Sequence, residues 1–402
     1  MRPFTSTISL EDARRRLDAA VRPIARVERV RLDAAAGRVS AADVVSPIDV
    51  PPFARSAMDG YAVIAADVVG ASKTQPARLR LLDRIYTGRM SQATIVAGTC
   101  AEIATGAPLP AGADAVVMVE ETARRGGDDV EIFAAAHAGQ NVGRRGGDIA
   151  SGDRVVAAGD LLTPSRVGAL AAVGCAEASV FAKPRVAILS TGNEVVEPGD
   201  PLPPGHIYDV NRFTLAAIVE AHGGAPESHR AAEDSVDALV AALDRCAAAD
   251  LVVFSGGSSV GERDLVVDAI AARGEMIFHG IAVRPGKPTA FAMVRGTPFF
   301  GMPGNPTSCL SNAYILLVPF LRALARLPTY APRTLRVPLG RRIASAVNRH
   351  QFYTVAVQDG VAQPAFKGSG DITSLSRADG YIEIPADQSV VEEGAIVTVT
   401  LF

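Results

Sequence analysis

Between residues 183 and 325, short apolar runs alternate with helical patterns along the chain. The runs RVAILS, DLVVFS and PFFGM have the composition of buried strands, whereas NRFTLAAIVEAHG, DLVVDAIAARG and TSCLSNAYILLVPFLRAL have the pattern of helices. Strands and helices in alternation predict a mixed, mostly parallel sheet with helices on both faces. In such an α/β/α fold, ligands bind at the carboxyl ends of the strands.

The remaining sequence predicts three further domains, so the expected fold class is multidomain α/β. Residues 1–45 and 150–182 contain helical patterns on either side of a β-rich segment. We therefore expect one discontinuous helical and β domain, interrupted by a β-rich insert at 46–149. The α/β domain is expected at 183–327, and the short β runs after it predict a small C-terminal, β-barrel-like domain at 328–402.

Composition argues against several classes of protein. The chain has 402 residues, 48% of them hydrophobic, and its net charge of -3 argues against nucleic acid as a partner. The four cysteines form no CxxC pair and the histidines no cluster, which argues against disulfides and zinc. The N-terminus lacks the apolar core of a signal peptide, and the longest apolar run, YILLVPFL, is too short to span a bilayer. We expect a cytoplasmic protein with no membrane partner.

Three loops rich in small residues follow the predicted strands: STGNE, SGGSSVGERD and GMPGNPTS. Glycines let an anion approach the backbone, and a helix N-terminus offers it unpaired N–H groups. The second loop lacks the Gly-Lys-Ser/Thr of the common nucleotide loop, and any one loop alone is explained by turn geometry. Three at one sheet edge favour an anion site. Its candidate residues are Ser190, Gly192, Ser255, Gly256, Gly257, Ser259, Gly304 and Asn305.

Two basic residues, Arg284 and Lys287, bracket a Pro-Gly turn in VRPGKPTAF. Two cations on a rigid turn suit a tetrahedral dianion or a pyrophosphate, because such buried charge needs partners. An exposed turn with solvated charges explains the same residues equally well. The turn alone leaves both interpretations open.

Acidic residues also occur at loop positions. Glu194 and Asp264 share loops with the glycines, where an anionic ligand beside them indicates a divalent cation, and oxygen ligands with phosphate favour Mg²⁺. As alternatives, Asp59 is a turn residue and Asp264 a helix cap. Asp148 ends the second of two RRGGD copies, and the sequence leaves open which copy matters. The full set of candidate acids is Asp59, Asp148, Glu194, Asp234 and Asp264.

Seven segments resemble, in order, the molybdopterin molybdenumtransferase family, which includes the bacterial MoeA proteins and the E domain of gephyrin. They are SAMDGYA, TGAPLPAGADAVVMVEET, RRGGDI, LSTGNE, SGGSSVGERD, RPGKP and MPGNPTS. The resemblance runs from about residue 5 to the C-terminus. It implies that molybdate is inserted into the dithiolene of adenylyl-molybdopterin, with Mg²⁺-dependent release of AMP. It also implies a homodimer whose cleft combines the α/β domain of one subunit with Asp59, Thr105 and Asp148 from the insert of the other.

The resemblance also implies roles for single residues. Glu194 and Asp264 match acids near the Mg²⁺ and the pyrophosphate, and Asp234 matches an acid of the same cleft. The residues that would hold molybdate are Arg284, Lys287, Ser308, Arg349 and Ser369. Two positions depart from the family pattern: Gly280 stands where some members carry lysine, and Arg284 replaces a lysine. An arginine fork keeps the charge but not the point-like geometry of lysine.

Other functions fit parts of the same pattern. A molybdopterin adenylyltransferase has a similar α/β domain but needs neither the insert nor the C-terminal domain. A non-catalytic scaffold of the same fold would need an exposed partner groove, and a tungstate-specific paralogue would differ only in subtle site geometry. Because the chain has no fused adenylyltransferase, we expect transient contact with a separate one and with downstream molybdoenzyme maturation factors.

Overall fold

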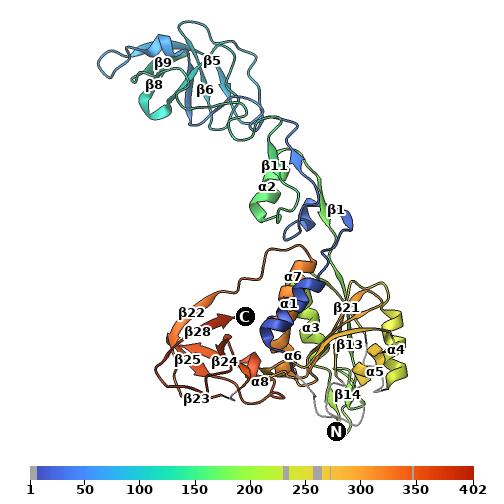
Figure 1. The fold of residues 1–402 in the computed structure, drawn as a ribbon. Coiled ribbons are helices and arrows are strands. Elements are labelled where there is room, and N and C mark those ends of the chain that lie inside the picture. Colours follow the sequence, from blue (N-terminus) through green and yellow to red (C-terminus); the bar gives the residue numbers. More distant parts are fainter. Residues whose placement is uncertain (1–6, 230–234, 257–264, 272, 346–347) are drawn as a thin grey trace. The chain divides into compact units, whose positions relative to one another are not determined.

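The computed structural model describes residues 7–229, 235–256, 265–271, 273–345 and 348–402 (Figure 1). The chain divides into two compact units. The first comprises Met1–Glu28, Gly37–Val39 and Val180–Phe402, and the second comprises Arg29–Ala36 and Ser40–Ser179. The boundaries of the four domains expected from the sequence stay a prediction.

The first unit contains a six-stranded sheet in the order β16–β13–β17–β21–β20–β18. The four strands from β16 to β21 are parallel, whereas β20 is antiparallel to both β21 and β18. The mixed, mostly parallel sheet predicted from the sequence is therefore confirmed. The strands are β13 Arg185–Ser190, β16 Ala225–Ser228, β17 Leu251–Ser255, β18 Gly274–His279, β20 Ala290–Val294 and β21 Thr297–Met302.

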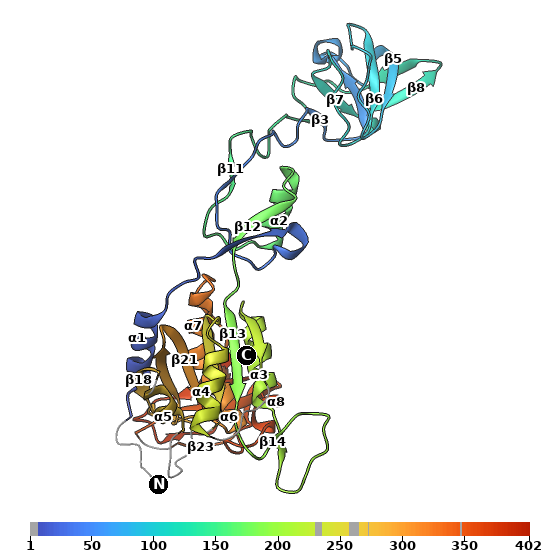
Figure 2. The same ribbon diagram turned by 90° about the vertical axis from the view of Figure 1, so that its right-hand side faces the viewer.

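Helices cover both faces of this sheet (Figure 2). Because successive strand residues point to opposite faces, Val186 and Ile188 pack in one core while Ala187 and Leu189 pack in the other. The first core includes residues of α1, α3, α6 and α7, and the second includes residues of α4 and α5. The helices are α1 Leu10–Ala20, α3 Asn211–Ala221, α4 Val236–Arg245, α5 Leu265–Ala271, α6 Pro306–Asn312 and α7 Val318–Leu324.

The longest helical segment of the described residues lies in the first core. This segment consists of α6, a π-helical turn, η4 Ala313–Leu317, and α7. Within the described ranges, Pro306–Leu324 has the length and apolar composition of a membrane span, and 72% of it is buried inside the protein. Its burial marks it as a core helix of the α/β fold.

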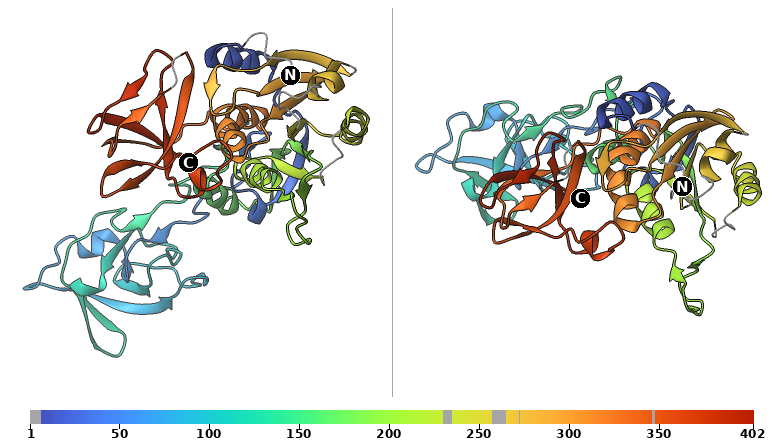
Figure 3. Two further views of the ribbon diagram at one scale, coloured as in Figure 1. Left: turned by 90° about the horizontal axis from the view of Figure 1, so that it is seen from below. Right: turned by 60° about the horizontal axis from the view of Figure 1, so that its bottom comes forward.

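A second six-stranded sheet forms the C-terminal part of the first unit, beside the helices of the α/β sheet (Figure 3). Its order is β19–β24–β26–β28–β22, with β25 paired to β24. Strand β19 comes from the α/β segment and pairs in parallel with β24, which joins the two sheets. The strands are β19 Val283–Arg284, β22 Thr334–Pro338, β24 His350–Gln358, β25 Val361–Pro364, β26 Gly380–Ile384 and β28 Ile396–Leu401, with β23 Ile343–Ala344 paired to β27 Val390–Val391 and α8 at Thr373–Ser376.

The second unit is mostly β. Its main sheet has the order β7–β4–β6–β5–β9–β8, and β5 and β6 are its parallel pair. The strands are β4 Gly60–Val63, β5 Ala77–Ile85, β6 Thr99–Ile103, β7 Ala115–Met118, β8 Thr122–Gly126 and β9 Asp129–Ile132. Short two-stranded pairs connect the remaining segments: β2 Val44–Val45 with β11 Arg154–Val156, β3 Arg55–Ser56 with β10 Val142–Gly143, and β1 Val27–Arg31 with β12 Glu177–Phe181. Helix α2, Pro164–Ala172, is capped by Thr163.

Candidate functional site

The three predicted loops leave the same edge of the α/β sheet. Ser190, at the end of β13, pairs with Ser255 at the end of β17, and Ser255 pairs with Met302 at the end of β21. The backbone N–H of Thr191 donates to the carbonyl of Ser255 at 3.1 Å. A Cβ placed on Gly304 would lie 3.7 Å from the Cα of Gly256. The small residues therefore bring the backbones of the loops into close contact.

Gly256 is needed for this approach. Its φ is +125°, and a Cβ there would lie 2.4 Å from the carbonyl oxygen of Thr191. Most other residues rarely adopt such a backbone conformation. Gly192, in the first loop, has a φ of +146°, and its Cβ would lie 2.7 Å from Val195 Cγ2. Two glycines that the sequence marked for anion approach are thus required by the packing of the loops themselves.

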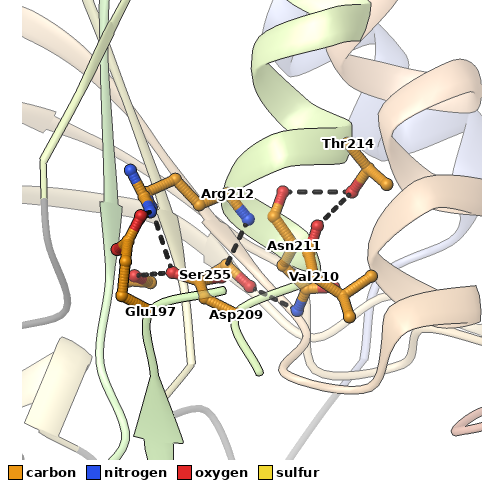
Figure 4. Close-up of polar contacts among 8 residues, drawn as sticks. Glu197, Asp209, Val210, Asn211, Arg212, Thr214 and Ser255 are labelled. Carbon is orange, nitrogen blue, oxygen red and sulfur yellow. Dashed lines mark hydrogen bonds and ion pairs between the residues drawn. The ribbon is translucent and has the colours of Figure 1, made fainter. Parts of the chain in front are cut away.

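Buried polar side chains that sequence reasoning missed lie directly behind these loops (Figure 4). Ser190 Oγ donates to Asp209 Oδ2 at 2.7 Å. Asn211 Nδ2 donates to Ser255 Oγ and to the carbonyl of Gly304, each at 2.7 Å. The only sequence signal was an asparagine near the start of a helix; in the structure Val210 takes the cap position and Asn211 is the first helical residue.

Arg212 connects this network to the loop that carries Glu194. Its Nε lies 3.2 Å from Asp209 Oδ2, and its Nη2 donates to both carboxylate oxygens of Glu197 at 2.5 Å. The side chain of Arg212 is 9% exposed and that of Asp209 is 5% exposed. Glu197 follows a short ribbon of β14 Val195–Val196 and β15 Ile207–Tyr208, visible in green in Figure 2. Arg212 therefore ties this ribbon to the start of α3.

Glu194 stands at the base of the ribbon with an exposed side chain. Its carbonyl accepts from the N–H of Ile207 at 2.9 Å, so its backbone is held while its carboxylate faces solvent. Carboxylate oxygens are ligands that Mg²⁺ accepts. Among the residues that the structure describes, no three His, Cys, Asp or Glu side chains gather as a metal site. The Mg²⁺ site stays a prediction.

Hydrogen bonds from neighbouring residues hold the backbone of the RPGKP turn, residues 284–288, in place. Asn312 Nδ2 and Thr289 Oγ1 both donate to the carbonyl of Gly286, at 2.8 and 2.9 Å, and both residues are fully buried. The N–H of Ile281 donates to the carbonyl of Lys287 at 2.9 Å. Arg284 is exposed and Lys287 half-buried. The turn thus presents two cations on a fixed backbone.

A loop of the C-terminal segment, between β25 and α8, brings further predicted residues to this region. Asn305 Nδ2 donates to Ser369 Oγ at 3.0 Å, and the N–H of Thr307 donates to the carbonyl of Ser369 at 3.1 Å. These bonds join the third loop to the KGSG segment. Ser308, 4% exposed, lies in the first turn of α6.

The pairing of β19 with β24 places Arg349 near the RPGKP turn. Arg349 directly precedes His350, which pairs with Val283 and donates its N–H to the carbonyl of Ala282 at 3.0 Å. Arg284 therefore lies on β19, next to β24, and Arg349 directly precedes β24. The structure thus brings the basic turn and the C-terminal residues to one junction.

Asp59 and Thr105 contact each other in the second unit. Both the N–H and the Oγ1 of Thr105 donate to Asp59 Oδ1, at 2.7 and 2.9 Å. The backbone bond, followed by the hydroxyl bond, lowers the pKa of Asp59 below its ordinary value. Asp59 is therefore held as a carboxylate with one oxygen fixed by Thr105.

Thr105→Val is expected to raise the pKa of Asp59 without restoring it fully, because the backbone donor remains. The carboxylate contributes stability above its ordinary pKa, and that contribution is lost as the pH falls through the lowered value. An NMR pH titration of the Asp59 carboxyl carbon measures both midpoints. Equal midpoints in the wild type and the variant would show that the hydroxyl has no influence on this charge.

The two RRGGD copies have different structures. The first, residues 124–128, belongs to the antiparallel hairpin of β8 and β9. The second is a loop in which Arg145 pairs with Asp49 at 2.7 Å and the N–H of Asp148 donates to the carbonyl of Val50 at 3.0 Å. The side chain of Asp148 is exposed. The copy that matches the family motif is thus the one outside a regular hairpin.

Four predicted site residues lie outside the described residues: Asp234, Gly257, Ser259 and Asp264. Their proposed roles rest on the sequence alone.

Cys309, close to Ser255, does not supply a nucleophile, because burial raises the pKa of its thiol to about 12.

Comparisons with known families match nearly the whole chain. Residues 8–174 match the MoeA N-terminal region (domain I and II), residues 187–323 match a probable molybdopterin binding domain, and residues 336–402 match the MoeA C-terminal region (domain IV). The matched segments follow one another in the order found in this chain.

Alignments with individual proteins cover almost the whole length of both chains. The molybdopterin molybdenumtransferase 2 of Mycobacterium tuberculosis is 40% identical over 392 residues, covering 94% of each chain. The molybdopterin molybdenumtransferase of Haemophilus influenzae is 32% identical over 409 residues, covering 98% of each chain. Two crystal structures of molybdopterin biosynthesis MoeA proteins from Pyrococcus horikoshii superimpose with TM-scores of 0.85 and 0.83, at 39% and 29% identity, over 98% and 99% of this chain and 99% and 100% of theirs. The chain belongs to the molybdopterin molybdenumtransferase (MoeA) family.

Proposed function

We propose that this protein is a transferase that inserts molybdate into the dithiolene of adenylyl-molybdopterin and releases AMP in a Mg²⁺-dependent reaction. The observation that carries the proposal is the meeting of three loops at one sheet edge, with a rigid basic turn in the same unit. We further propose that it acts in the cytoplasm as a homodimer, with transient contact to the adenylyltransferase and to downstream maturation factors.

The strand-end loops are suited to the pyrophosphate of the substrate. Gly256 and Gly304 let the loop backbones pack closely at the strand ends, and α6 begins directly after the third loop, where backbone N–H groups are available to an anion. Ser190 and Ser255 already bond to Asp209 and Asn211, so their side chains support the loops. In the proposed reaction water cleaves the bond between the two phosphates, so that AMP leaves with one phosphate and the pterin keeps the other.

The basic turn is suited to molybdate. Arg284 and Lys287 offer two positive charges to a dianion, and charge-assisted bonds to oxyanions are the stronger class of hydrogen bond. Ser308 would add a donor from α6, and Arg349 and Ser369 would add donors from loops of the C-terminal segment. In the transfer, two thiol protons leave with one molybdate oxygen as water while two Mo–S bonds form.

Carboxylates fit a hard cation beside the pyrophosphate. Glu194 is exposed at the sheet edge, and Glu194 with Asp264 would hold the Mg²⁺. Bound there, Mg²⁺ would neutralise charge on the phosphate oxygens. We propose that Asp59, Thr105, Asp148 and Asp234 contribute further contacts to the substrate.

AMP release by the purified protein tests this function. Adenylyl-molybdopterin and Mg²⁺ are incubated with and without molybdate, and AMP is quantified by chromatography. The proposal expects release that rises with molybdate. Binding of the substrate with no release under any oxyanion would instead indicate a non-catalytic scaffold.

Lys287→Ala is expected to raise the molybdate concentration for half-maximal AMP release by about 10-fold or more, since one charged hydrogen bond contributes roughly 1.5–3 kcal/mol. Lys73→Ala, which removes an exposed lysine from the second unit, is the control and is expected to leave the curve unchanged. An unchanged curve for Lys287→Ala would remove this lysine from the molybdate site.

A further inference from the structure

The segment Asp209–Arg212 reaches the ends of three neighbouring strands. Asp209 accepts from Ser190 at the end of β13, and Asn211 donates to Ser255 at the end of β17 and to Gly304 in the loop after β21. Figure 4 shows Asp209, Asn211 and Ser255 in this arrangement. One short segment at the start of α3 is therefore bonded to all three loops of the candidate site.

We propose that Asn211 is a positioning residue for the reaction, which fixes Ser255 at the end of β17 and Gly304 after β21 at the separation that the substrate's phosphates require. The inference rests on the proposed function and adds a residue to it. Asn211 acts through Ser255 and Gly304, whose backbones lead into the loops.

Both N–H groups of the Asn211 side-chain amide have hydrogen-bond acceptors. Its two N–H groups are matched by the two acceptors, Ser255 Oγ and the Gly304 carbonyl, both at 2.7 Å. Asn211 is 8% exposed, so water does not readily replace these bonds. A buried side chain that bonds to both Ser255 and Gly304 sets the distance between these two residues, and a misplacement of about 1 Å costs on the order of 100-fold in rate.

The acceptor side of the same amide is buried and unpaired among the described residues. Within the part of the chain that the structure describes, Asn211 Oδ1 is buried and has no hydrogen-bond partner. A buried acceptor left unpaired costs roughly 1–3 kcal/mol. A hydroxyl or N–H of the bound substrate, or a water that it carries, would satisfy this oxygen.

Asn211→Asp tests the proposal because it keeps the shape and removes both donors. Thr214→Val is the matched control, since Thr214 lies one turn further along α3 and its hydroxyl donates to the carbonyls of Val210 and Asn211 within the same helix turn. For each protein, kcat and KM for adenylyl-molybdopterin are measured in the AMP release assay, and folding is checked by thermal unfolding.

The proposal expects a KM that rises by about 10-fold or more in Asn211→Asp, with kcat also reduced, and a KM within about 2-fold of wild type in Thr214→Val. Partial unfolding alone would lower the apparent kcat at an unchanged KM. An unchanged KM in Asn211→Asp, with an active wild type, would overturn the role of Asn211 only. An inactive wild type would overturn the proposed function itself.

Discussion

Gly286→Ala is expected to destabilise the protein and to raise the molybdate requirement for AMP release by about 100-fold. Gly286 has a φ of +100°, and a Cβ there would lie 2.2 Å from Asn312 Nδ2. Asn312 is fully buried and bonds to the Gly286 carbonyl, so it cannot move without breaking the support of the turn. Strained backbone of roughly 1–2 kcal/mol and overpacking of roughly 1–3 kcal/mol both oppose the variant.

Gly296→Ala is the matched control for this prediction. Gly296 has a φ of +84°, but a Cβ there would meet no atom within 4 Å. The control therefore carries the backbone strain without the clash. Urea unfolding and the molybdate dependence of AMP release are measured for both variants. Equal losses in the two variants would show that the contact with Asn312 does not determine the geometry of the basic turn.

Arg212→Ala is expected to lower the free energy of unfolding by about 3–5 kcal/mol, because it leaves a buried carboxylate without its partner. Asp209 is 5% exposed and would lose its ion-pair partner, while Ser190 Oγ at the end of β13 still donates to it. The ribbon that carries Glu194 would also lose its tie to α3, so AMP release should fall by about 10-fold or more. Urea unfolding and AMP release measure the two effects.

The control for Arg212→Ala is Arg342→Ala. Arg342 pairs with Glu392 at 3.3 Å, and these side chains are 57% and 69% exposed. Exposed pairs contribute about 0–1 kcal/mol, so little loss is expected. If Arg212→Ala were as mild as this control, the buried ion pairs would have no structural importance at the site.

The α/β sheet could be predicted from sequence because its parallel strands are continuous apolar runs followed by helices. Strands β18 and β20 were harder to foresee. The hairpin between β20 and β21 turns at Arg295 and Gly296, which have φ values of 52° and 84°. Two positive φ values favour Asn-Gly or Asp-Gly, and an Arg-Gly pair gives a much weaker signal.

The loops of the candidate site could be located from sequence, but their supports could not. Glycine and serine after a strand are a local pattern. Asn211 and Ser255 are 44 positions apart, and Asn312 reaches Gly286 across 26 positions, so these bonds depend on the tertiary fold. A single polar residue at the start of a helix fits a cap equally well, and burial alone distinguishes the two.

The measurement that tests the central claim most directly compares two amounts: the AMP that is released and the molybdenum that becomes bound to the pterin. The purified protein is incubated with adenylyl-molybdopterin, Mg²⁺ and molybdate, and AMP and pterin-bound molybdenum are quantified in the same samples over time. Insertion coupled to cleavage predicts that the two amounts rise together in equal proportion. Release of AMP with no molybdenum in the pterin product, or no release at all, would contradict the assignment as a molybdenum insertase.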